Sequence, residues 1–261
     1  MAVLDTFSLK GRKALVTGGA AGYGKCISEG LAEAGATTII ASRSEQKRQK
    51  VIQSLTDSGY DAHSYYLDQG QEESINKLHE QLVQRFGAMD ILVNNAVLRP
   101  MKGYRAPLDQ WRESIEVNVT GMFHLTRLFA EDMIKQCRGS IINISSIFGM
   151  VAPTLWQYEG MGPAMEDSPP DYWFHNAGVI NLTRFLAARL GEHNIRVNAI
   201  SPGGLFAGQG EPFLSRYCKN TFLGRMAGPD DIKGAIVFLA SDASAYLTGI
   251  NLPVDAGFTA H

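Results

Sequence analysis

Tyr172 and Asn176 stand four residues apart in the stretch Asp171-Tyr-Trp-Phe-His-Asn176, which opens a run of helical period. Residues at this spacing on a helix share one face, so we expect both side chains to face the same cleft. A tyrosine in water has a pKa of about 10 and is a poor base at neutral pH unless a nearby positive charge favours its phenolate. Asn176 can form hydrogen bonds but carries no charge. Tyr172 is therefore a candidate for proton transfer only where a positive charge lies close to it, and Asn176 does not supply one.

A second candidate site is the glycine-rich run Thr17-Gly-Gly-Ala-Ala-Gly-Tyr-Gly24, which follows an apolar segment and opens into a helical one. Gly18, Gly22 and Gly24 would allow a tight turn and the close approach of a pyrophosphate, whose charge a helix N-terminus stabilises. Glycines also collect in purely structural turns, but these have the strand–turn–helix context that the motif requires. We therefore predict a dinucleotide site here, with Tyr23 as one of its residues.

The end of the next apolar run indicates which dinucleotide binds. Sites for NAD place an acidic residue there for the ribose 2′-hydroxyl, whereas sites for NADP need a cation for the 2′-phosphate. This chain has Ser42 and Arg43 at that point, followed by Lys47 and Arg48. A guanidinium can bind phosphate through two hydrogen bonds. The alternative is a solvated basic helix face. We predict NADP, with NAD possible.

Stepwise alternation of apolar runs with helical segments indicates the elements that hold these residues. Strands separated by helices pair in parallel through right-handed crossovers. We therefore predict an α/β fold, a doubly wound parallel seven-stranded Rossmann sheet in a single domain over residues 1–261. The expected strands are Lys13–Thr17, Thr38–Ala41, Ser64–Leu67, Asp90–Val93, Ser140–Ile144, Arg196–Ile200 and Ile250–Val254.

Composition excludes several classes of function. The formal net charge of the 261 residues is -2, which argues against nucleic acid as a partner. The three cysteines form no pair or cluster, so neither a disulfide framework nor a metal site is expected. No signal peptide or membrane-spanning run is visible. We expect a cytoplasmic protein with a small-molecule substrate.

Several of these motifs occur together in an order that resembles the short-chain dehydrogenase/reductase family. They are Thr17-Gly-x-x-x-Gly-x-Gly24, Asn94-Asn-Ala96, Asn118, Ser146, Tyr172 and Pro202-Gly203, and the resemblance continues to Gly257. It implies that Tyr172 is the acid/base, that Ser146 orients the substrate carbonyl and that Asn118 holds a water for proton relay. It also implies a homotetramer, and a cofactor cleft that includes Asp68, Gln69, Asn95, Ala96, Asn176, Pro202 and Gly203.

The chain departs from the family pattern at three points. Val97 replaces a glycine, the hydroxyl residue expected after Pro202-Gly203 is missing, and Asn176 takes the place of the catalytic lysine. In the family that lysine binds the nicotinamide ribose and lowers the pKa of the tyrosine. Its loss leaves three alternatives: a slow enzyme, a substitute such as His175 or a substrate amine, or a domain that binds cofactor without turnover. Tyr158 is a rival acid/base, but its glycine-rich surroundings suit a loop.

Ser146 and Tyr172 are 26 residues apart, about twice the spacing usual in the family. A long irregular segment inside a compact domain is commonly functional, so we predict a substrate loop at about 149–171 and a lid at about 204–224. This region looks like a subgroup of bacterial sugar oxidoreductases. A sugar needs hydrogen bonds and an apolar face, which Trp156, Tyr158 and Glu159 could supply, together with His175. Arg99 could bind an anionic group.

The motifs together predict an NADP-preferring oxidoreductase that interconverts an alcohol and a ketone on a polar, carbohydrate-like substrate. One alternative is a cofactor-binding sensor or structural subunit with weakened catalysis. Another is an epimerase or eliminase that uses transient oxidation.

Overall fold

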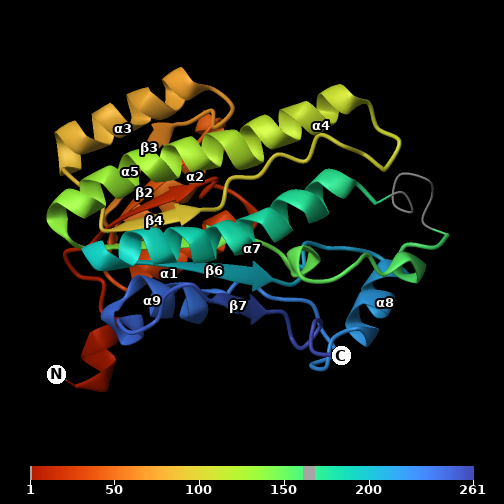
Figure 1. The fold of residues 1–261 in the computed structure, drawn as a ribbon. Helices are drawn as coiled ribbons and strands as arrows, with labels where there is room; N and C mark the ends of the chain where they lie inside the picture. Colours follow the sequence, from red (N-terminus) through yellow and green to blue (C-terminus); the bar gives the residue numbers. More distant parts are fainter. Residues whose placement is uncertain (1, 161–167) are drawn as a thin grey trace.

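A single parallel sheet forms the centre of the protein, whose computed structural model describes residues 2–160 and 168–261 (Figure 1). The strands follow the order β3-β2-β1-β4-β5-β6-β7, and every neighbouring pair is parallel. The predicted seven-stranded doubly wound sheet is therefore confirmed. The strands are β1 (Lys13–Thr17), β2 (Thr37–Ser42), β3 (Ala62–Tyr66), β4 (Ile91–Asn94), β5 (Gly139–Ile144), β6 (Ile195–Pro202) and β7 (Asn251–Val254).

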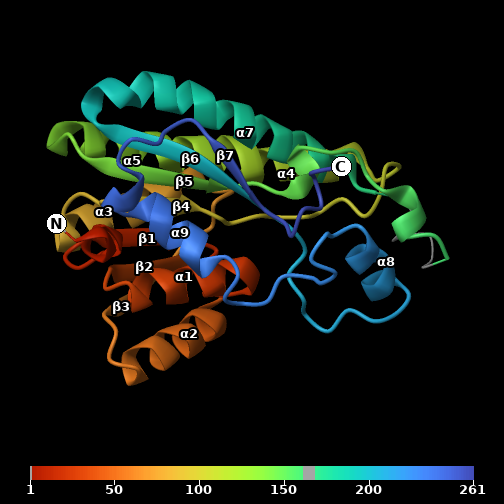
Figure 2. The same cartoon turned by 90° about the horizontal axis from the view of Figure 1, so that it is seen from below.

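Helices cover both faces of the sheet, as Figures 1 and 2 show from two directions. One face carries α3 (Glu72–Phe86), α5 (Met122–Gln136) and α7 (Pro170–Leu190), and the other carries α1 (Gly22–Glu33), α2 (Glu45–Asp57) and α9 (Lys233–Ala240). Short 3-10 turns occur at Val3–Phe7, Ile147–Gly149, Leu155–Gln157, Gly191–His193 and Asp242–Ser244. No helix in the described ranges is long and apolar enough to cross a membrane.

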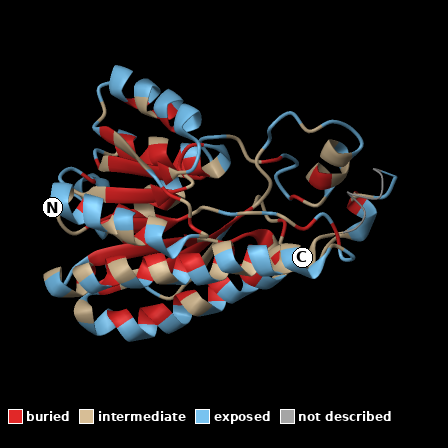
Figure 3. Ribbon diagram, turned by 90° about the horizontal axis from the view of Figure 1, so that it is seen from above, coloured by how far each residue is buried: buried red, intermediate tan, exposed pale blue. Residues whose placement is uncertain are grey.

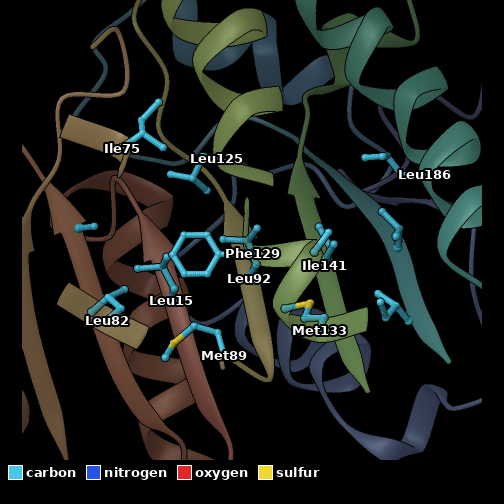
Figure 4. Packing of buried hydrophobic residues seen from close by; sticks show 14 of the residues in the cluster. Leu15, Ile75, Leu82, Met89, Leu92, Leu125, Phe129, Met133, Ile141 and Leu186 are labelled. Atoms are coloured by element: carbon cyan, nitrogen blue, oxygen red, sulfur yellow. The ribbon is translucent and has the colours of Figure 1, made fainter. Parts of the chain in front are cut away.

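The core is double because successive strand residues point to opposite faces. Leu15 of β1 and Leu92 of β4 lie in the cluster that packs against α3, α5 and α7, part of which Figure 4 shows around Phe129. Val16 and Val93, one residue further along each strand, lie in the cluster against α1 and α9. Burial on both faces explains why the strands read as continuous apolar runs. In Figure 3 the strands are accordingly buried, and the outer surfaces of the helices are exposed.

The long helical stretch that follows β4 contains an interruption that the sequence did not reveal. It begins as α4 (Leu108–Ile115), widens into a π-helical segment at Glu116–Gly121 and continues as α5. Gly121, the last residue of this segment, has no room for a side chain, since a Cβ there would lie 1.8 Å from the carbonyl oxygen of Gln69. Single π-helical turns inside α-helices are frequent at functional sites. Asn118 lies within this one.

The carboxyl ends of the strands open toward a separate group of loops. The short helix α8 (Phe213–Lys219) belongs to this group and lies apart from the helical layers in Figure 2. The segment that follows β5 belongs to the same group of loops, as far as residue 160, where the first described range ends. Ligands of open α/β sheets bind outside the carboxyl ends of the strands, at the point where the strand order reverses. That point is the β1–β4 boundary.

Candidate active site

A cavity of about 930 Å³ lies at this edge of the sheet, between the segments that follow β1, β4, β5 and β6. It gathers most of the residues that the sequence nominated for cofactor, catalysis and substrate. Those lining it are Gly18, Gly22, Tyr23, Gly24, Asn95, Ala96, Arg99, Asn118, Ser146, Tyr158, Tyr172, His175, Asn176, Pro202 and Gly203. Segments from distant parts of the chain therefore form one site.

Six nominated residues do not line this cavity: Ser42, Arg43, Asp68, Gln69, Trp156 and Glu159. The first four lie at the ends of β2 and β3. The Gln69 side chain is buried and donates to the Val117 carbonyl at 2.8 Å, and Asp68 accepts from the Gly70 amide at 3.1 Å. Trp156 and Glu159 are exposed on the segment after β5.

The glycine-rich turn has the shape that a dinucleotide needs. Gly24 has no room for a side chain, because a Cβ there would lie 2.2 Å from the carbonyl oxygen of Gly18. Gly22 has φ of 51°, a left-handed conformation that glycine adopts without strain. Helix α1 begins at Gly22, and its N-cap residue Ala21 forms no side-chain hydrogen bond. The first amides of the helix are therefore available to a pyrophosphate, so the residues fit the group.

The strand ends beside this turn are held together by polar contacts. Thr17 accepts hydrogen bonds from the amides of Asn95 and Ala96, both at 3.0 Å, and its carbonyl accepts from Asn95 Nδ2 at 2.9 Å. Across the cleft, the Tyr23 hydroxyl donates to the Gly203 carbonyl at 2.9 Å. Burial raises the pKa of the Tyr23 phenol, so it remains a neutral donor. The floor of the cleft is thus preorganised.

The basic residues after β2 divide into two kinds. Arg48 is buried and donates to the Ser42 carbonyl, so its guanidinium serves to close the end of β2. Arg43 and Lys47 are exposed. Ser44, at the N-cap of α2, accepts from the Lys47 amide at 3.4 Å and thereby begins the helix. Only Arg43 and Lys47 of this group are available to a ligand.

Tyr172 is placed by the first turn of α7 and contacts a cation. The Arg99 Nη2 donates to its hydroxyl at 2.7 Å, and the guanidinium carbon lies 4.1 Å from the centre of its ring. The ring also packs edge-on against Phe148 and His175, with centroids 6.3 Å and 5.3 Å away. Tyr172 thus has a fixed orientation, and its hydroxyl accepts a hydrogen bond from a positively charged side chain. The arginine comes from the segment that follows β4.

The hydroxyls of Ser146 and Ser145 have different partners, because successive side chains at the end of a strand point in opposite directions. The Ser146 oxygen accepts from the Phe148 amide at 3.2 Å at the start of a 3-10 turn, which leaves its hydroxyl proton for a ligand in the cavity. The Ser145 hydroxyl instead donates to the Asn176 carbonyl at 3.0 Å. Ser145 therefore ties the end of β5 to α7.

Asn118 is engaged by the backbone of Leu98. Its Oδ1 accepts from the Leu98 amide at 2.8 Å, and its Nδ2 donates to the Leu98 carbonyl at 2.7 Å and to Ser114 Oγ at 3.0 Å. Both N–H donors of this amide are thus occupied by the protein. The π-helical segment places Asn118 to hold the chain immediately before Arg99.

Asn176 is buried and turned back toward its own helix. Its Nδ2 donates to the Tyr172 carbonyl at 2.7 Å and lies 3.2 Å from His175 Nε2. His175 is 4% exposed, and burial lowers the pKa of its imidazole to about 4, although the adjacent Asp171 opposes this shift. His175 is therefore neutral at neutral pH. Neither residue supplies a positive charge to Tyr172.

The segment after β5 is joined to α8. Arg216 donates to the carbonyls of Trp156, at 3.3 Å, and of Glu159, and Asn220 Nδ2 donates to Gln157 Oε1 at 3.0 Å. Tyr158 packs against Phe213 with ring centroids 5.7 Å apart. The described parts of 149–171 and 204–224 are therefore joined, and we call them together the cover, because Tyr158 and Phe213 from the two segments line the cavity. Residues 161–167 of the predicted substrate loop lie outside the described residues.

Sequence reasoning missed the aromatic wall beneath this cover. Phe148 stacks on Trp173 at 4.4 Å, and the Tyr217 hydroxyl accepts from the Gly204 amide while its ring stacks on Phe258 at 5.2 Å. Burial raises the pKa of Tyr217 to about 12, so it stays protonated. These residues carry no motif. The only signal was the density of aromatic residues in the segments flanking the cavity.

Comparison with known proteins agrees with this geometry. The family model described as enoyl-(acyl carrier protein) reductase matches residues 18–259. The chain belongs to the short-chain dehydrogenase/reductase family. It is 34% identical over 255 residues to 3-oxoacyl-(acyl-carrier-protein) reductase FabG of Aquifex aeolicus, covering 95% of this chain and 98% of that protein.

Two further relatives carry names from carbohydrate chemistry. The chain is 32% identical over 267 residues to galactitol 2-dehydrogenase of Rhizobium johnstonii, covering 99% of both chains. It is similar, with a TM-score of 0.87 and 32% identity over 99% of both chains, to the crystal structure of a gluconate 5-dehydrogenase from Burkholderia cenocepacia in complex with NADP and tartrate. These comparisons agree with membership of the family.

Proposed function

We propose that this protein is an NADP-preferring oxidoreductase that interconverts an alcohol and a ketone on a polyhydroxy substrate. The observation that carries the proposal is that Ser146, Tyr172 and the glycine-rich turn line one cavity. A pure cofactor-binding module needs the turn but has no use for the serine and tyrosine. Their presence together favours catalysis.

Two side chains would handle the substrate oxygen, and a third part of the site would shield it from water. The Ser146 hydroxyl, with its proton free, would donate to the carbonyl oxygen and hold it in place. Tyr172 would give its proton to that oxygen during reduction and remove it during oxidation. The cavity cover, through Tyr158 and α8, would restrict the access of water.

The cofactor, when bound, supplies or accepts the hydride. We propose that the amides at the start of α1 hold its pyrophosphate and that Asn95, Ala96 and Gly203 line its cleft. Asp68 and Gln69 would flank the adenine. Arg43 is proposed to bind the 2′-phosphate, because it is exposed beside Ser42 and no carboxylate replaces it at the end of β2.

A polyhydroxy substrate suits the other half of the cavity. Tyr158, His175, Gln209 and Glu211 offer hydrogen-bonding groups there, and Phe148 offers an apolar face. The two relatives named for galactitol and gluconate support this class. Trp156 and Glu159 would act on the substrate only indirectly, by shaping the cover.

Assembly and location are carried over from the family resemblance. We propose a homotetramer, supported by the exposed aromatic side chains Phe123, Phe174 and Phe185 on α5 and α7, which a second copy would cover. The three cysteines are unpaired, which suits the reducing cytoplasm. Light scattering at micromolar concentration tests the assembly.

The experiment for the proposed function is a panel of polyols, sugars and sugar acids, including galactitol and gluconate. Turnover is followed at the absorbance of the reduced cofactor, with NADP and NAD, from neutral to alkaline pH. Turnover with at least one polyhydroxy compound is expected. Tight cofactor binding with no turnover on any member would favour the sensor alternative, for which the buried neutral Asn176 is the specific observation.

A further inference from the structure

The hydroxyl of Tyr172 is contacted by Arg99, a residue that no motif associates with it. The guanidinium donates to the phenol oxygen at 2.7 Å and lies over the ring at 4.1 Å. A hydrogen bond from a charged donor is stronger to a phenolate than to a neutral phenol. The contact therefore stabilises the form of Tyr172 that accepts a proton.

Other cations at this site can be excluded in turn. Among the described residues that line the cavity, Arg99 is the single arginine or lysine. His175 is neutral at working pH, because burial lowers its pKa to about 4. Asn176 carries no charge, and its Nδ2 is bound to the Tyr172 carbonyl. The positive charge that acts on Tyr172 thus has one source within the described site.

The backbone of Arg99 is held from both sides, which makes the contact more than a chance surface encounter. Asn118 binds both the amide and the carbonyl of Leu98, the preceding residue. On the other side, Lys102 Nζ donates to the Arg99 carbonyl at 3.2 Å. The π-helical segment that carries Asn118 thus fixes the point from which the guanidinium reaches Tyr172.

The remaining titratable and charged groups around Tyr172 do not replace this charge. Burial raises the pKa of the Tyr158 and Tyr23 phenols, so both stay neutral. The acidic groups, Asp171 on α7 and Glu211 before α8, would disfavour a phenolate nearby. They increase the need for a cation.

We propose that Arg99, from the segment after β4, supplies the positive charge that activates Tyr172 as the proton-transferring group. This rests on the proposed function, in which Tyr172 is the acid/base. Arg99 then acts through Tyr172. It supplies the positive charge that the family's lysine would supply from the position of Asn176 on α7. The rival role for the same side chain is to anchor a carboxylate of the substrate.

The test titrates the phenol directly and needs no substrate. Tyrosinate absorbance is followed against pH for the protein and for Arg99→Gln, each corrected by the same protein carrying Tyr172→Phe, so that the difference belongs to Tyr172. Because Arg99 is exposed and its charge is therefore screened by solvent, we expect Arg99→Gln to move this titration by only about one pH unit toward alkali. Arg99→Lys, which keeps the charge, should stay close to the wild type.

The matched control is Arg105→Gln, which removes another exposed positive charge from the same segment. In this variant Tyr172 should titrate at the same pH as in the wild type. The proposal is overturned if Tyr172 titrates at the same pH in Arg99→Gln as in Arg105→Gln. It is also overturned if Arg99→Lys, which keeps the charge, shifts the titration of Tyr172 as far as Arg99→Gln does. Melting temperatures confirm that each variant is folded.

Kinetics separates the two roles of Arg99. With galactitol, which has no charge, Arg99→Gln should lower kcat at neutral pH about tenfold and leave KM within a few-fold, because one pH unit is a factor of ten. A raised KM for gluconate with an unshifted pH profile of kcat would support the carboxylate anchor instead. Full turnover of Tyr172→Phe would contradict the proposed function itself. An inactive Tyr172→Phe beside an unshifted Arg99→Gln contradicts only this inference.

Discussion

Lowering the pH should destabilise this protein through His175. The imidazole is 4% exposed, and burial lowers its pKa to about 4, whereas a histidine in the unfolded chain has a pKa of 6.5. The unfolded state therefore binds the proton more tightly, so stability is lost as the pH falls below 6.5, until the folded state also protonates near pH 4. Between pH 7 and pH 5 the loss due to this residue is about 2 kcal/mol.

Urea unfolding at pH 7 and pH 5, at one protein concentration, measures this loss. His175→Gln has no proton to bind and should lose about 2 kcal/mol less than the wild type over the same interval. His193→Gln, in the turn Gly191–His193, is the control for removal of a histidine. Equal pH dependence of the wild type and His175→Gln would refute the reasoning and reopen His175 as a cation beside Tyr172.

Two further predictions concern the cofactor site. Gly24→Ala would place a Cβ 2.2 Å from the Gly18 carbonyl, so calorimetry should show at least tenfold weaker cofactor binding, whereas Gly178→Ala, with open space at its Cβ, should bind normally. Arg43→Ala should weaken NADP by about 1.5–3 kcal/mol and leave NAD unchanged, because a charge-assisted phosphate contact is lost. Unchanged binding to Gly24→Ala, or an unchanged ratio of NADP to NAD, would contradict these assignments.

The sheet was predictable because each strand has the same local sequence pattern. Continuous apolar runs such as Ile39–Ala41 result from burial on both faces, and each run is followed by a helical period. The glycine-rich turn was predictable for the same reason, since a tight turn before a helix has a local sequence requirement. What holds these segments together does not follow from either pattern.

The contacts that distinguish this site join distant segments and have no local signature. Arg99 meets Tyr172 across 73 residues, and the clearest hint was a basic residue shortly after Asn94-Asn-Ala96. The π-helical segment ends at Gly121, which packs closely against Gln69 in the turn after β3, about 50 residues earlier in the chain. The burial that keeps His175 neutral is likewise a tertiary property. Sequence alone could nominate these residues but not pair them.

Proton transfer by Tyr172 is tested most directly by Tyr172→Phe, which removes only the hydroxyl. Cofactor binding by calorimetry and the melting temperature should stay near the wild type, because the ring still packs against Phe148 and His175. Turnover of the best substrate from the panel should fall by at least a hundredfold, in line with the usual contribution of general acid–base catalysis, about 10²–10⁴. A folded, cofactor-binding Tyr172→Phe that keeps most of its turnover would contradict the mechanism.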